Sequence, residues 1–212
     1  MARLATEREI NALLKKYGIP HVREETAKDF EGLLRASKKL RRPWVLKIIS
    51  PEATHKTDRG LVRLHIDDEG ELVRAFEEVK RKARGLKVEC FLLQEQKKGV
   101  EFIVGGKRDA SFGKVLVFGL GGVFVELLKE RAIRVLPAGK AELHGMVRQT
   151  KAYAFVKGYR NQWVSEAKIV GLLEKTARML EDNDAIEELD FNPVIANGDE
   201  LWVADARIVL RE

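Results

Sequence analysis

Two side chains suited to phosphate chemistry, Lys47 and His55, lie eight positions apart. Lys47 interrupts an apolar, β-branched run at residues 45–49, which predicts a buried strand. An ammonium group in such a strand needs an anionic partner. His55 follows in a polar loop, residues 52–60, beside Lys56, Thr57 and Asp58. Taken alone, His55 is more typical of a solvated surface loop than of a catalytic site.

The end of the chain carries a candidate metal site. Asn197 and Gly198 favour a two-residue type I′ turn, which would place Asp190 opposite Asp205 and Asn192 opposite Val203. In that register Asp190, Asn192 and Asp205 share one face of a hairpin. Oxygen ligands without His or Cys suit Mg²⁺ together with substrate phosphates. The alternatives are a solvated polar face and a hydrogen-bonded Asp–Asn pair.

The middle of the chain holds weaker candidates. A polar segment at residues 94–99 joins two predicted strands, as a hairpin loop or as a hinge that faces a ligand, and Glu101 lies in the second strand. Three glycines at 119, 121 and 122 permit close approach of an anion, so Gly121 and Gly122 are phosphate-loop candidates. The segment matches neither a Walker A loop nor GxGxxG. Arg134, in a further short strand, is a third phosphate candidate, with a solvated strand edge as the alternative.

Composition narrows the class of protein. The chain has 212 residues, of which 45% are hydrophobic and 34% charged, enough for a substantial core. The formal charge is +6, but Lys and Arg alternate with Asp and Glu, so nucleic-acid binding is not expected. The single cysteine, Cys90, excludes an intrachain disulfide. No run spans a bilayer and no leader precedes the first helix, so a soluble cytoplasmic protein is expected.

Local signals predict an α/β (α+β) fold with helices laid on a sheet. Thr6 and Glu9 form a capping box for a first helix that ends before Gly18. Residues 26–29 and 68–71 repeat the signal for a second and a third helix, a further helix begins near Pro137, and Ser165 caps the last long one. Strands fill most of the intervening segments.

Several motifs in the same order resemble those of one family. The likeness covers nearly the whole chain through LLKKYGIP, VLKIISPEATHKTDRG, LLQEQKKGVEFIVGGKRDASFGKVLVFGLGGVFVEL, KAYAFVKGYR, EELDFNPV and VADARI. They resemble the ATP-grasp subunit, the β subunit, of ADP-forming acetyl-CoA synthetases, within the nucleoside-diphosphate-forming acyl-CoA synthetases. One departure is Arg59-Gly60-Leu61, which stands where the family shows a glycine pair.

The resemblance implies a two-lobed ATP-grasp fold over residues 1–212, with lobes of about 1–93 and 94–212 and the nucleotide between them. It implies ATP or ADP and Mg²⁺ as cofactors. The implied roles are phosphate contact for Lys47, adenine-side contacts for Glu95, Gln96 and Lys98, ribose contact for Glu101, Mg²⁺ binding for Asn192 and Asp205, phosphoryl transfer for His55, and support of that histidine for Asp190.

Three functions remain open at this point. The first is a β subunit that passes a phosphoryl group between His55 and ADP, with a CoA-binding α subunit as its partner in a hetero-oligomer. The second is an ATP-grasp ligase that forms an acyl phosphate directly, with His55 structural. The third is a non-catalytic nucleotide- or RNA-binding protein, which is disfavoured because no aromatic platform lies on a basic strand.

Overall fold

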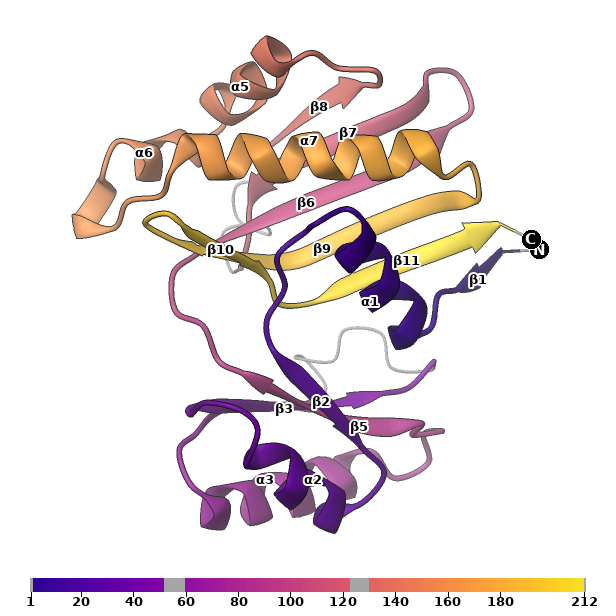
Figure 1. Cartoon of the computed structure of the whole chain (residues 1–212), viewed down its shortest axis with the longest axis vertical. Helices are drawn as coiled ribbons and strands as arrows, with labels where there is room; N and C mark the ends of the chain where they lie inside the picture. Colours follow the sequence, from indigo (N-terminus) through magenta and orange to yellow (C-terminus); the bar gives the residue numbers. More distant parts are fainter. Residues whose placement is uncertain (1, 52–59, 123–129, 212) are drawn as a thin grey trace. The chain divides into compact units, whose positions relative to one another are not determined.

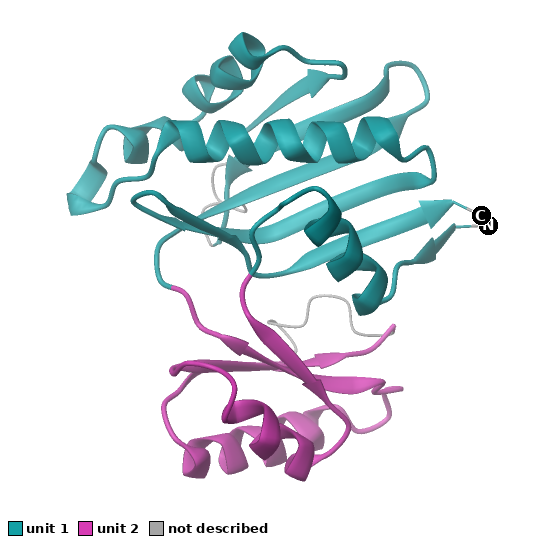
Figure 2. Cartoon of the chain, in the orientation of Figure 1, with its two compact units in different colours: residues 1–21, 98–212 teal, residues 22–97 magenta. Residues whose placement is uncertain are grey.

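The computed structural model describes residues 2–51, 60–122 and 130–211 (Figure 1). The chain forms two compact units (Figure 2). One unit combines residues 1–21 with 98–212, and the other comprises residues 22–97. The lobes expected from the sequence, 1–93 and 94–212, differ from this division mainly at the N-terminus. The reason is that β1 (Ala2–Leu4) pairs with β11 (Ala206–Arg211) at the far end of the chain.

The unit of residues 1–21 and 98–212 is built on one sheet, with strand order β1-β11-β9-β6-β7-β8 and β10 paired to β9. Its remaining strands are β6 (Val100–Asp109), β7 (Gly113–Leu120), β8 (Arg131–Val135), β9 (Ile186–Asn197) and β10 (Glu200–Val203). Its helical segments are α1 (Glu7–Lys16), α5 (Lys140–Gln149), α6 (Tyr153–Val156), η1 (Tyr159–Asn161) and α7 (Glu166–Asp182).

Helices α1, α5 and α7 cover one face of this sheet (Figure 1). The core lies between them and the sheet, where Phe102 and Phe118 stack with ring centroids 5.7 Å apart. Phe191 and Leu189 of β9 are buried in the same core. Because side chains alternate along a strand, the residues between these on β6 and β9 point to the opposite face. That opposite face carries the candidate site.

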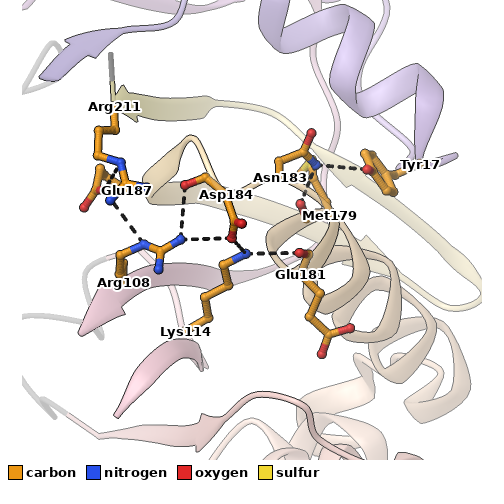
Figure 3. Close-up of polar contacts among 9 residues, drawn as sticks. All are labelled: Tyr17, Arg108, Lys114, Met179, Glu181, Asn183, Asp184, Glu187 and Arg211. Carbon is orange, nitrogen blue, oxygen red and sulfur yellow. Dashed lines mark hydrogen bonds and ion pairs between the residues drawn. The ribbon is translucent and has the colours of Figure 1, made fainter. Parts of the chain in front are cut away.

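A polar network fixes the C-terminal end of α7 to the sheet (Figure 3). Lys114 of β7 donates to the carbonyl oxygen of Glu181 at 3.1 Å and to Asp184 at 2.8 Å. Arg108 of β6 donates to the Asp184 carbonyl and carboxylate, both at 3.1 Å. Cations at a helix C-terminus satisfy carbonyls that have no partner within the helix. The network therefore holds the C-terminal end of α7 against the β6–β7 hairpin.

The unit of residues 22–97 is a smaller α/β layer, with strand order β2-β5-β3-β4. Its elements are β2 (Glu24–Ala27), α2 (Phe30–Ser37), β3 (Trp44–Ile49), β4 (Val62–Ile66), α3 (Glu69–Lys82) and β5 (Cys90–Glu95). Both helices pack on the face that carries Trp44, Leu46 and Ile48. The alternate residues of β3, Val45 and Lys47, therefore lie on the other face.

Three helix starts follow their local signals. Thr6 and Glu9 form the capping box of α1, Asp68 accepts the Glu71 N–H at the start of α3, and Ser165 is the N-cap of α7. The prediction at residues 26–29 is wrong by three positions, because Thr26 is in β2, paired with Leu92, and Asp29 caps the helix. No helix among the described residues is long and apolar enough to cross a membrane.

Candidate functional site

The C-terminal hairpin brings Asn192 directly opposite Asp205. The Asn192 N–H donates to the Asp205 carbonyl at 3.0 Å, and Arg207 pairs with Asp190. The predicted register, with Asp205 opposite Asp190 and Val203 opposite Asn192, is wrong by two positions. Asn197 pairs with Glu200, so the turn consists of Gly198 and Asp199.

Contacts with another segment account for this turn. Gly198 has a φ of 59°, donates to the Trp163 carbonyl at 2.9 Å and accepts from the Ser165 N–H at 2.9 Å. With Gly198 in the first loop position, its N–H and its carbonyl are both hydrogen-bonded.

A shift of the register by two residues leaves each side chain on its original face, because the period of a strand is two. Asp190, Asn192 and Asp205 therefore share one face, which we call the acidic face.

A β-bulge interrupts β9 at Asn192 and Pro193. Phe102 of β6 pairs with Val194 and Val104 pairs with Phe191, so Asn192 and Pro193 together oppose Ile103. Bulges of this kind bend a strand, and they are over-represented beside active sites. Here the bend lies next to the break between β10 and β11, where Asp205 is found. The irregularity thus occurs at the predicted metal pair.

The acidic face has the electrostatics of a cation site. Burial, and then the negative charges of Glu188 and Asp205, raise the pKa of Asp190, while Arg131 and Arg207 act in the opposite direction. A divalent cation would relieve this repulsion. The oxygen donors of Asn192 and Asp205 fit Mg²⁺, which binds one or two carboxylates together with substrate phosphates. No group of three or more His, Cys, Asp or Glu residues suited to a metal occurs among the described residues.

Glu101 and the two loop glycines lie together on the same face. Glu101 pairs with Ile195 in β9, and its carbonyl accepts the Gly121 N–H at 2.7 Å. A Cβ at Gly121 would lie 3.0 Å from backbone atoms of Glu101 and Phe102, and one at Gly122, where φ is 63°, would lie 2.6 Å from Glu101 Oε2. Burial raises the pKa of the Glu101 carboxyl, although the residue as a whole is exposed. The glycines are therefore required for the position of this carboxylate.

Arg134 does not join this group. Its guanidinium donates to Gln149 of α5 at 2.8 Å, on the face that the helices cover. Arg131, three residues earlier, lies on the acidic face, as does Arg207. Neither arginine is among the candidates inferred from the sequence. Residues three positions apart on a strand point to opposite faces. The two arginines could therefore have been assigned to different faces once the start of β8 was known.

Lys47 is buried in β3 of the smaller unit, with 7% of its surface exposed. It pairs with Leu92 and Val62, on the face opposite the helices. Gln94 is a diagonal neighbour on that face, and its amide donates to Glu24 at 2.5 Å. Lys47 thus lies on the sheet face opposite α2 and α3, beside the polar Gln94. Residues 52–59, with His55, lie outside the described residues.

Glu95 and Gln96 are held inside the smaller unit by their side chains. Glu95 accepts from the Arg41 N–H at 3.1 Å and from Lys97 at 3.2 Å. Burial acts to raise the pKa of its carboxyl, but these bonds and the charges of Lys97 and Arg23 outweigh burial and lower it. The side-chain oxygen Oε1 of Gln96 accepts the backbone N–H of His65 at 2.7 Å. Lys98, by contrast, is exposed at the start of the second segment of the larger unit.

Comparison with known proteins gives the class to which this fold and site belong. A family model described as an ATP-grasp domain matches residues 2–210. The chain therefore belongs to the ATP-grasp family.

The relatives narrow this class. The beta subunit of ADP-forming acetate–CoA ligase II from Pyrococcus furiosus is 34% identical, over 97% of this chain and 91% of the subunit. The beta subunit of ligase I of that organism is also 34% identical, over 96% and 90%. The Archaeoglobus fulgidus ADP-forming acetate–CoA ligase II is 38% identical, but the chain spans only 31% of it. Within the family, this chain is of the ADP-forming acetate–CoA ligase beta-subunit type.

A solved structure supports the same family assignment. Acetyl-coenzyme A synthetase 1 of Ca. Korarchaeum cryptofilum, in complex with coenzyme A and Ca-AMPCP, has a TM-score of 0.92 and 36% identity. The match covers 99% of this chain and 93% of that one. The expected mixed α/β ATP-grasp fold is therefore confirmed.

Proposed function

We propose that this chain is the nucleotide-binding beta subunit of an ADP-forming acyl-CoA synthetase, a ligase. It couples acyl-CoA, phosphate and ADP to the carboxylic acid, CoA and ATP, and its own share is phosphoryl transfer between His55 and ADP. The observation that carries the proposal is the opposed Asn192–Asp205 pair beside Asp190, in a chain that covers 91% of a relative named as such a subunit.

The chemistry assigns each group a task. In the transfer, the phosphorus–nitrogen bond of phosphohistidine breaks and its electron pair returns to the imidazole nitrogen, while a terminal oxygen of ADP forms the new bond to phosphorus. Such a reaction depends mainly on alignment and on neutralisation of charge. We assign Lys47 to the nucleotide phosphates, Asn192 and Asp205 to Mg²⁺, and Asp190 to the second imidazole N–H.

The nucleoside is assigned to Glu101, with Gly121 and Gly122 holding its carboxylate in place. Glu95, Gln96 and Lys98 remain adenine-side assignments. Since the side chains of Glu95 and Gln96 are engaged with Arg41, Lys97 and His65, and their N–H groups donate to the Arg23 and Pro43 carbonyls, their part would be to shape the end of β5.

The remaining half of the reaction is assigned to a CoA-binding alpha subunit. The Korarchaeum synthetase has been solved with coenzyme A, Mg-AMPPCP and a phosphohistidine segment pointing towards its nucleotide binding site. That finding supports His55 as the carrier here. A reaction that draws on ADP and CoA also favours a cytoplasmic location.

Labelling with γ-³²P-ATP and Mg²⁺ tests the proposal. The wild-type chain should retain label that acid removes and alkali spares, and His55→Asn should lose that label while still binding ATP. The matched control is His144→Asn, because His144 contacts Glu166 at 2.7 Å in the helical layer and should not affect labelling. A direct ligase would give no stable label and only a modest rate loss in His55→Asn. Unchanged labelling of that variant would refute the carrier role.

A further inference from the structure

Arg131 lies across the acidic face from the candidate metal pair. In the sheet, Asp190 pairs with Gly105, and Gly105 with Val117. In the next row Ile103 pairs with Gly119, and Gly119 with Arg131. Of the four positions between Arg131 and the acidic residues, Gly105 and Gly119 carry no side chain, and Ile103 and Val117 are apolar.

Gly119 also makes room for Arg131. A Cβ at Gly119 would lie 3.4 Å from Cγ of Arg131 and 2.8 Å from the carbonyl oxygen of Glu130. The stem of the arginine thus passes over a position where no other residue would fit without displacement. The guanidinium is exposed, so it is free to meet a ligand above the sheet.

The other arginines near this face or on this strand are already engaged. Arg207 forms an ion pair with Glu188 at 3.1 Å, and Arg134 donates to Gln149 at 2.8 Å. The Arg131 side chain forms no ion pair or hydrogen bond with the described residues, although it shares the acidic face with Asp190. An arginine that faces carboxylates without pairing to them is available to an anion bound between them.

We infer that Arg131 is a phosphate-binding residue, which contacts the terminal phosphate of a Mg²⁺–nucleoside triphosphate whose metal is held by Asn192 and Asp205. The inference rests on the proposed function for the nucleotide, but it does not depend on His55. A guanidinium binds two non-bridging phosphate oxygens at once, and the cation at the carboxylates supplies the opposing charge. Arg131 therefore takes the place that the sequence analysis gave to Arg134.

Calorimetric titration of the full chain with Mg·ATP and with AMP tests this inference. Arg131→Gln should weaken Mg·ATP binding about ten- to a hundredfold, as expected for one charge-assisted contact, and should leave AMP binding unchanged. Arg131→Lys should retain part of the affinity. The matched control is Arg134→Gln, on the same strand but the opposite face, which should bind both nucleotides as wild type does.

Four results would overturn the inference: unchanged Mg·ATP affinity in Arg131→Gln, an equal loss for AMP, the same loss in Arg134→Gln, or a wild-type chain that binds Mg·ATP no better than AMP. Failure of the proposed function is separable, because it is read from the His55 label. If the chain binds Mg·ATP through Arg131 but never becomes labelled, the role of His55 as phosphoryl carrier is refuted. The assignment of Arg131 to the terminal phosphate then still stands.

Discussion

Substitution Gly122→Ala separates the backbone role of a glycine from its role in placing Glu101. Gly122 has a φ of 63°, where an L-residue other than glycine costs about 1–2 kcal/mol. The added methyl group would also lie 2.6 Å from Glu101 Oε2, so the carboxylate must turn away. We expect a fall in Tm of roughly 2–8 °C from the backbone effect. The ADP Kd should rise about tenfold or more, as expected for one lost contact to a charged group.

Gly113→Ala is the matched control, because Gly113 has a φ of 77° and nothing lies within 4 Å of the point that its added methyl group would occupy. Both variants should lose similar stability in thermal unfolding, whereas only Gly122→Ala should lose ADP affinity in calorimetry. Equal ADP affinity in the two variants would show that the position of Glu101 does not matter for nucleotide binding, and would refute its assignment.

Three further predictions concern other parts of the larger unit. Asp205→Ala should abolish the gain in nucleotide affinity that Mg²⁺ provides and leave the circular dichroism spectrum unchanged; a retained Mg²⁺ effect would contradict the metal assignment. Because the folded state raises the pKa of Asp190, ionisation destabilises the metal-free fold as pH rises above 3.8. Asp190→Asn should therefore raise Tm at neutral pH without Mg²⁺, with the difference vanishing towards pH 3.8; a constant difference would exclude titration as its cause. Lys114→Met removes the bond to the Glu181 carbonyl and the exposed ion pair with Asp184. Loss of the carbonyl bond should lower stability by about 1 kcal/mol with ADP affinity unchanged, as measured by urea unfolding and calorimetry.

Local rules were sufficient for the starts of α1 and α3 and for the relative faces of neighbouring residues on one strand. The capping box at Thr6 and the N-cap at Asp68 involve groups three residues apart, so the sequence carries all of the information. The common face of Asp190 and Asn192 follows from the two-residue period of a strand, and it survives the error in register. The composition of the metal pair could therefore be proposed before the fold was known.

Register and strand partners depend on residues far away in the chain. Gly198 takes the first loop position because Trp163 and Ser165 hold its backbone groups, and neither is near it in sequence. The bulge at Asn192 occurs in the pairing of β9 with β6, a strand far away in the chain. Residues 2–4 join the sheet through β11, at the other end of the chain.

The choice between the two arginines of β8 illustrates the same division. A short strand containing Arg134 could be predicted, but its face could not, because alternation gives only relative positions until one residue is anchored. Pairing of β8 with β7 supplies that anchor by burying Ala132 and directing Arg134 to α5. The sequence alone thus determined which residue types could bind a magnesium nucleotide, whereas long-range strand pairing decided that Arg131 faces the acidic residues and Arg134 does not.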